Sequence, residues 1–163
     1  MRIVNLLGVI GIIGVAALLA LPAIAGPPGD PENRTVTGTC IKVVDGDTIV
    51  VKCDKRQMTV DLAGIDAPEL GQPWGKEVRS FVRDMVEGSQ ITVEVIEAGE
   101  TGGTARVLIA GQDLSRLLAE RGLAWATAGG GLEDLTEKAK SAPCGLWLDA
   151  QPVPPWQFRE TAA

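Results

Sequence analysis

The sequence contains no histidine, and this absence limits the chemistry that the chain can perform. It excludes a serine–histidine triad, a histidine general base and a histidine-ligated zinc site. Carboxylates are then the only catalytic bases to be expected near neutral pH. The 163 residues suffice for one domain of ordinary size, so a second domain is not expected.

Positive charge and cysteine are also scarce. The chain has 15 Lys and Arg against 21 Asp and Glu, a formal net charge of -6. The excess of positive charge that usually assists nucleic-acid binding is therefore absent. The three cysteines are Cys40, Cys53 and Cys144, and if the chain is exported to an oxidising compartment, a disulfide is favoured over a cysteine metal site.

The N-terminus is a long apolar stretch. Residues 3–25 are interrupted only by Asn5 and end in Ala-Ile-Ala before Gly26, the small-x-small pattern of a secretory cleavage site. We predict that residues 1–25 are a signal peptide, whose removal deletes one arginine and no acid and changes the net charge from -6 to -7. An uncleaved membrane anchor is the alternative, because the stretch is long enough to span a bilayer. In both cases we expect an exported domain, periplasmic or secreted, or anchored outside the cytoplasm.

The remainder predicts one domain after a short linker. Residues 26–34 are rich in Pro, Gly and charge and predict a flexible linker, followed by a folded domain over 35–159. We predict strands at 35–44, 47–53, 58–64, 90–96 and 105–110, helices at 73–87, 112–121 and 132–142, and an irregular tail rich in Pro and Trp. The order of the elements indicates a mainly β chain with helices (α+β), a five-stranded OB-fold barrel with about three helices.

Two acidic segments are the candidates for a functional site. The first strand pair is joined by an Asp-Gly turn that carries Asp47, and the third strand ends in a corner with Asp66 and Glu69, stiffened by Pro68. Taken alone, the first segment is explained by simple turn chemistry. If the barrel brings both segments together, the three carboxylates need a cation or raised pKa values. A site of oxygen ligands only is typical of Ca²⁺.

Four motifs in order along residues 36–159 resemble the staphylococcal nuclease (thermonuclease) family: VVDGDTIVV, VDLAGIDAPELGQPWGKEVRSFV, GQDLSRLLAERGLAWA and PVPPWQFRE. The resemblance implies an OB-fold, one Ca²⁺ ion and hydrolysis of DNA and RNA phosphodiesters by an activated water. By motif position it implies that Asp47 and Asp66 are calcium ligands together with the backbone carbonyl of Ala67. It implies that Glu69 is the general base or positions the water.

The same resemblance exposes two departures. The two phosphate-binding arginines of the family fall here on Asp61 and on Gly102 or Gly103. Loss of one preorganised donor typically lowers the rate by about 100 to 1,000, and Asp61 adds repulsion toward phosphate. Lys42, Lys55, Arg56 and Arg106 are the candidate replacements, although a solvated surface charge is the more ordinary role for each.

Three functional hypotheses therefore remain. The chain is an exported Ca²⁺-dependent nuclease of weak activity that acts on DNA or RNA, or a catalytically inactive module that keeps the barrel and the cation site for binding. The third is an interaction domain tethered to a membrane through residues 3–25, in which the acids only stabilise a turn. We expect a monomer in each case.

Cysteines and tryptophans give two further expectations. If the first hairpin closes symmetrically between Gly46 and Asp47, Cys40 and Cys53 face each other, which predicts a disulfide and leaves Cys144 as a buried apolar residue. We expect Trp125, Trp147 and Trp156 to pack in the core and tail rather than stack on bases. For Trp74, close to Glu69 in sequence, packing and ligand contact are equally expected.

Overall fold

The computed structural model describes residues 34–162. The predicted signal peptide or anchor, and the predicted linker up to residue 33, lie outside the described residues. No helix within the described range is both long enough and apolar enough to cross a membrane.

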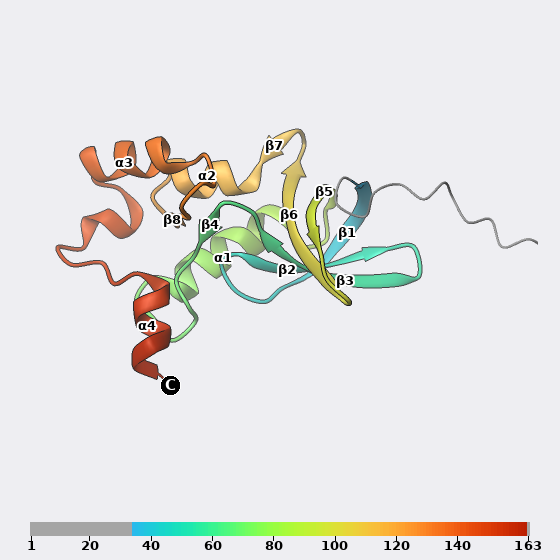
Figure 1. The fold of residues 1–163 in the computed structure, drawn as a ribbon, viewed down its shortest axis with the longest axis horizontal. Helices are drawn as coiled ribbons and strands as arrows, with labels where there is room; N and C mark the ends of the chain where they lie inside the picture. The colour runs from blue at the N-terminus through green and yellow to red at the C-terminus, as the bar shows by residue number, and fades with distance from the viewer. Residues whose placement is uncertain (1–33, 163) are drawn as a thin grey trace, which may run out of the picture.

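Figure 1 shows the order of the strands and helices along the described chain. The elements are β1 (Thr35–Val43), β2 (Thr48–Cys53), β3 (Arg56–Leu62), β4 (Ile65–Asp66), α1 (Gly75–Val86), β5 (Gln90–Ala98), β6 (Gly102–Ile109), β7 (Gln112–Asp113), α2 (Leu114–Glu120), β8 (Trp125–Ala126), α3 (Glu133–Ser141), a 3-10 helix (Gly145–Leu148) and α4 (Pro155–Ala162). The predicted strands and helices agree with these bounds to within three residues.

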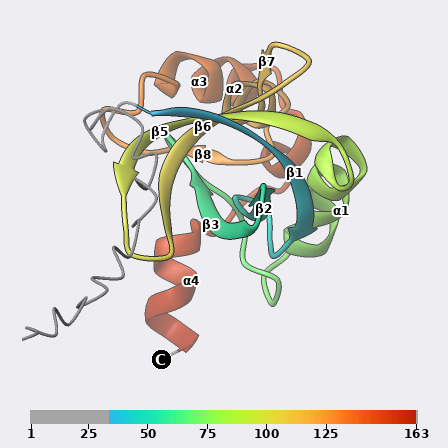
Figure 2. The same cartoon turned by 90° about the vertical axis from the view of Figure 1, so that its right-hand side faces the viewer.

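Five strands form a closed barrel, as Figure 2 shows end-on. β1 pairs antiparallel with both β2 and β5, β2 pairs with β3, and β5 pairs with β6. The parallel pairing of β3 with β6 closes the ring, so no long strand of the barrel keeps an open edge. This confirms the predicted α+β class and the OB-fold barrel.

Helix α1 closes the side of the barrel next to β1. Val78, Val82 and Val86 recur every four residues and are fully buried, as an amphipathic helix requires. The helix also serves the end of β1: the guanidinium of Arg79 donates two hydrogen bonds to the Val43 carbonyl, and Glu87 accepts one from the Val43 amide. The start of the turn after β1 is thereby fixed.

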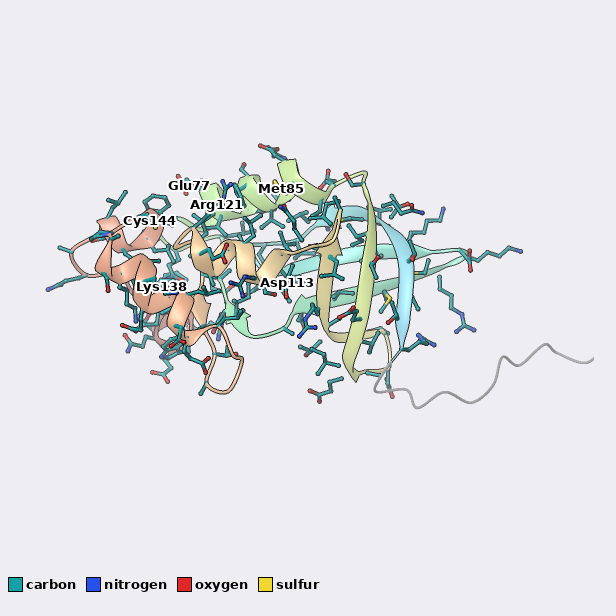
Figure 3. All side chains as sticks on the ribbon, turned by 90° about the horizontal axis from the view of Figure 1, so that it is seen from above. Glu77, Met85, Asp113, Arg121, Lys138 and Cys144 are labelled. Atoms are coloured by element: carbon teal, nitrogen blue, oxygen red, sulfur yellow. The ribbon has the colours of Figure 1, made fainter. Side chains whose placement is uncertain are left out.

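The remaining helices form a second layer at one end of the barrel. Asp113 caps α2 by accepting a hydrogen bond from the Arg116 amide. Arg121, at the end of α2, lies beside α1 with its guanidinium 5.1 Å from the centre of the Phe81 ring (Figure 3). This layer positions the segment that leads to the C-terminal tail.

The prediction of an irregular tail was wrong, because the tail contains the 3-10 helix and α4. The rings of Trp147 and Trp156 pack edge-to-face on Trp125 at 5.2 and 6.4 Å, so tail packing of these tryptophans is confirmed. A helix as short as α4 is stable only when docked. The apolar contacts of α4 come from segments far away in the sequence. The local sequence pattern therefore does not predict this helix.

The predicted Cys40–Cys53 disulfide is absent from the structure, and the three cysteines are free thiols. The turn closes with Val43 opposite Ile49, one residue out of the predicted register, and a β-bulge between Cys40 and Lys42 shifts the pairing by one more residue. Cys40 therefore pairs with Val51 instead of Cys53. Cys40 is fully buried in the core, whereas Cys53 packs beside Gly38. Burial raises the pKa of both thiols, which disfavours the reactive thiolate.

This register predicts the number of alkylated cysteines. When the protein is unfolded in iodoacetamide without reductant, we expect three alkyl groups by intact mass, because no bridge protects a thiol. A Cys40–Cys53 bridge would limit the count to one, and prior reduction would then raise it to three.

Candidate active site

The turn between β1 and β2 holds its shape through Asp45. The Oδ1 atom of Asp45 accepts hydrogen bonds from the amides of Asp47 (3.2 Å) and Thr48 (2.7 Å). Gly46 allows the turn to lie directly on the core, because a Cβ at this position would stand 2.6 Å from the Ala67 Cβ and 2.8 Å from a methyl carbon of Val78. The turn is therefore pressed against the corner that follows β3.

Asp47 joins the turn to this corner. Its Oδ2 atom accepts a hydrogen bond from the Ala67 amide at 2.5 Å, and its backbone carbonyl accepts one from Leu62 at 2.8 Å. The structure thus brings together the two acidic segments that are 20 residues apart in sequence. In this arrangement Asp47 engages the Ala67 amide, while the predicted cation ligand of Ala67 is its carbonyl.

Asp66 and Glu69 occupy a rigid part of the same corner. Asp66 lies on β4 opposite Trp125, with 16% of its side chain exposed. Glu69 is 33% exposed, and its amide and carbonyl both hydrogen-bond to Gln72. A Cβ at Gly75 would lie 1.9 Å from the Glu69 carbonyl oxygen, so α1 begins as close to this loop as a glycine permits.

Asp61 is a fourth acid of the site. It pairs with Thr48 across β2 and β3, and the Thr48 hydroxyl lies 3.1 Å from Oδ1 of Asp61 and 3.5 Å from Oδ1 of Asp47. Asp61 therefore adjoins Asp47 through the Thr48 hydroxyl and adds negative charge beside it.

Arg159 of α4 is the residue that sequence reasoning missed. Its Nη1 donates to Asp66 Oδ1 (3.1 Å) and to Glu69 Oε1 (2.7 Å), and its Nη2 donates to Asp66 Oδ2 (2.8 Å). The signal was present in the motif PVPPWQFRE, but 93 residues separate this arginine from Asp66. Only the docked tail shows that they meet.

The charges of the cluster shift two pKa values. Burial, the largest cause, and then the neighbouring carboxylates of Asp45 and Asp66 together raise the pKa of Asp47 to about 7, against the lowering effect of the hydrogen bond from the Ala67 amide. The hydrogen bonds to Asp66, and then those to Glu69, raise the pKa of Arg159 above its already high value. Arg159 therefore stays charged while Asp47 is partly protonated near neutral pH.

The donor chemistry of the cluster fits a hard divalent cation, because Asp47, Asp66 and the Ala67 carbonyl offer oxygen atoms only. Among residues 34–162, however, no three acidic, histidine or cysteine side chains are arranged as a ready metal site. The guanidinium of Arg159 instead occupies both oxygens of Asp66. The cluster accommodates positive charge, and a cation on Asp66 would exchange with Arg159.

Two of the basic residues proposed as replacements are placed away from these acids. Arg106 pairs with Glu94 and Asp113, and Lys42 is exposed on β1. Gly102 and Gly103, to which the resemblance assigns the other arginine, leave no room for a side chain. A Cβ at either position would lie within 2.0 Å of a backbone carbonyl oxygen. An arginine would not fit at either glycine without a different loop.

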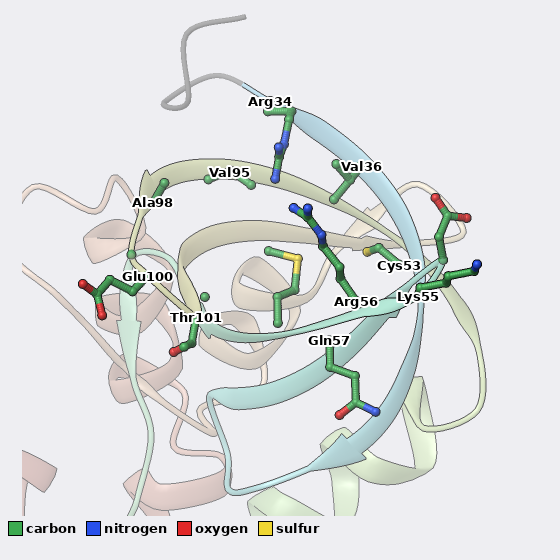
Figure 4. A pocket seen from close by; sticks show the side chains of 14 residues that line it. Arg34, Val36, Cys53, Lys55, Arg56, Gln57, Val95, Ala98, Glu100 and Thr101 are labelled. Atoms are coloured by element: carbon green, nitrogen blue, oxygen red, sulfur yellow. The ribbon is translucent and has the colours of Figure 1, made fainter. Parts of the chain in front are cut away.

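Lys55 and Arg56 line a cavity of about 770 Å³ at the mouth of the barrel (Figure 4). The side chains of Arg34 and Arg56 point toward one another in Figure 4, and Met58 also lines the cavity. The lining includes none of the site carboxylates, so this cavity is separate from the candidate site. Trp74 packs against the core, which favours packing over ligand contact as the role of this residue.

A closed five-strand barrel that presents acids from the first turn and from the corner after the third strand defines an OB-fold domain of the nuclease type. The family model described as staphylococcal nuclease homologue matches residues 59–149. An uncharacterized endonuclease of Escherichia coli O157:H7 is 31% identical over 130 residues, covering 76% of this chain and 85% of the relative. The chain belongs to the staphylococcal nuclease family, as its sequence motifs indicated.

Other relatives carry related names. A micrococcal nuclease of Shigella flexneri is 29% identical over 141 residues, which are 77% of this chain and 81% of the relative. A staphylococcal-like nuclease of Arabidopsis thaliana is 28% identical over 110 residues, 64% of this chain but 34% of that longer protein. The likeness therefore extends from bacterial to plant proteins.

The raised pKa of Asp47 predicts how stability depends on pH. Asp47 ionises near pH 4 in the unfolded chain and about pH 7 in the folded protein, so the folded protein holds the extra proton between these values and its free energy of unfolding falls as pH rises through them. We expect Asp47→Asn to raise that free energy by about 2 to 4 kcal/mol in EDTA at about pH 8, and to change it little near pH 4. Urea unfolding at both pH values, with the exposed Asp84→Asn as control, measures the difference. A loss of stability at the higher pH would contradict the assignment.

Proposed function

We propose that this chain is an exported nuclease that hydrolyses phosphodiester bonds of DNA or RNA with one Ca²⁺ ion, and that its activity is weak. The observation that carries the proposal is the meeting of two distant segments, the β1–β2 turn and the corner after β3: Asp47 accepts a hydrogen bond from the Ala67 amide, and Asp66 and Glu69 of the same corner share Arg159. Family membership supports the class of reaction. Export is supported by the signal-peptide pattern of residues 1–25 alone.

The roles of the residues follow from their positions. Asp47, Asp66 and the Ala67 carbonyl would hold the cation, which supplies positive charge for the oxygens of the phosphate when bound. Glu69, partly exposed beside Asp66, would accept a proton from a water molecule whose oxygen attacks phosphorus. One P–O bond forms and another breaks, and the leaving oxygen is protonated from solvent.

The weak activity is proposed because of Asp61. Its carboxylate shares the Thr48 hydroxyl with Asp47, so it stands where approaching phosphate meets like charge. The second candidate function, an inactive cation-binding module, is favoured by the same observation. The two differ only in whether the site still stabilises the transition state of hydrolysis.

Catalysis is tested directly with the purified protein. We expect slow cleavage of single-stranded DNA and RNA in Ca²⁺, no cleavage in EDTA, and at least about a 100-fold loss in Glu69→Gln because the proton acceptor is removed. Gel-resolved cleavage of labelled oligonucleotides gives the rates. No cleavage together with a Ca²⁺-dependent rise in melting temperature would leave the binding module as the function.

Removal of the charge at Asp61 tests the cause of the weak activity. We expect Asp61→Asn to raise kcat/KM about tenfold and Asp61→Arg to raise it further, because repulsion toward phosphate is replaced by a neutral or attractive group. Asp84→Asn and Asp84→Arg on the exposed face of α1 are the matched controls. Equal rates for the Asp61 and Asp84 variants would show that Asp61 does not limit turnover.

A further inference from the structure

Arg159 makes three hydrogen bonds to two of the proposed site carboxylates, all between 2.7 and 3.1 Å. Such bidentate, charge-assisted contacts are the strong and directional ones. Half of the Arg159 side chain remains exposed, so its guanidinium faces solvent on one side and the acids on the other. A group in this position can exchange partners without leaving the site.

The tail presents Arg159 through a set of specific contacts. The buried side chain of Gln72 donates a hydrogen bond to the Val153 carbonyl, and Pro155 is buried at the start of α4. Phe158 lies beside Gly71, in the loop that also carries Glu69. Both Gln72 and Gly71 belong to that loop, so α4 is attached to the same segment whose acid its arginine binds.

Trp125 couples the tail to the other acid. It pairs with Asp66 across β4 and β8, and its ring packs on Trp156 of α4 at 6.4 Å. The position of Arg159 is therefore tied to Asp66 through one aromatic residue and to Glu69 through the loop at Gln72. A surface ion pair formed by chance would not need its arginine to be attached to the segments of both acids.

No other guanidinium takes this place in the described part of the chain. Within residues 34–162, Arg159 is the arginine with a hydrogen bond to Asp47, Asp61, Asp66 or Glu69, and Arg79 donates to the Val43 carbonyl instead. Hydrolysis of a phosphodiester builds negative charge on the phosphate oxygens, and a fixed guanidinium is well suited to stabilise it. Strand β3 carries Asp61, an acid, at this site. A guanidinium that stabilises the phosphate therefore has to come from the tail.

We propose that Arg159 serves two partners in turn. Without a divalent cation it pairs with Asp66 and Glu69 and offsets one of their two negative charges, and once Asp66 holds a cation it turns to the phosphate of the nucleic acid. Arg159 then acts as a catalytic residue supplied by the C-terminal helix, in place of an arginine on the barrel. This inference rests on the proposed function, since it names the residue that binds the phosphate at that site.

The proposal has two measurable consequences of opposite sign. Arg159→Gln removes a competitor for Asp66, so Ca²⁺ binds about tenfold more tightly by calorimetry, because the freed carboxylate no longer has to give up a bidentate partner. The same change removes a phosphate ligand, so Ca²⁺-dependent affinity for a fluorescent single-stranded oligonucleotide falls about tenfold, and cleavage falls about 100-fold.

The design separates these effects from general charge. The oligonucleotide affinity is measured by anisotropy in a Glu69→Gln background in both arms, so no substrate is cleaved during the titration. Arg83→Gln is the control with the same loss of charge, because within residues 34–162 the ion-pair partner of Arg83 is Asp84 on the exposed face of α1. Arg159→Lys keeps the charge without the bidentate geometry and should lie between wild type and Arg159→Gln in both assays.

The outcomes distinguish the inference from the proposed function. Tighter Ca²⁺ binding with weaker oligonucleotide binding, both absent in Arg83→Gln, supports the two roles. Unchanged Ca²⁺ affinity, or tighter Ca²⁺ binding with unchanged oligonucleotide affinity, would overturn the proposal. If both binding changes occur and wild type cleaves nothing, only the proposed catalysis is lost and the phosphate contact of Arg159 stands.

Discussion

The close approach of the β1–β2 turn to the corner after β3 is the constraint on which the candidate site depends. It needs Gly46, because any side chain there would collide with Ala67 and Val78. It also needs an acceptor for the Ala67 amide, which Asp47 provides. One glycine and one hydrogen bond thus place acids from distant segments together, and the resulting repulsion has to be offset by protonation or by positive charge.

The structure offsets this repulsion in both ways. Asp47 is held in a buried position that raises its pKa to about 7, so it lowers its own charge near neutrality. Asp66 and Glu69 instead share Arg159, which offsets one of their two negative charges. The two responses follow from burial: the enclosed acid gains a proton, while the more accessible pair gains a guanidinium. A cation at this site would compete with a proton for Asp47 and with Arg159 for Asp66 and Glu69.

The sequence sufficed to predict what depends on local pattern. The alternation along the strands and the valines of α1 gave the barrel and its main helix, and the Asp-Gly turn and Pro68 marked the two acidic segments. The bulge at Ile41 was not predicted, because Ile41 is an apolar residue of the kind expected in a strand, yet Ile41 and Lys42 are both exposed between the buried Cys40 and Val43. This inserted residue, together with a turn that closes one residue out of the predicted register, separates Cys40 from Cys53. The fold of the tail depends on Trp125, Gln72 and Gly71, all far from it in sequence, and no local period records such contacts.

The position of Arg159 also changes how Asp61 and the two glycines are to be understood. Judged by the barrel alone, their replacement of arginine would remove the positive side of a phosphate site. Gly102 and Gly103 lie so close to the backbone of β3 and β5 that this loop has no room for a long side chain. Positive charge near the acids must therefore come from outside the barrel, and a docked helix with its own anchors can deliver it more rigidly than a loop can. The tail is then part of the site's chemistry, because removing it would expose two unpaired carboxylates as well as an aromatic surface on Trp125.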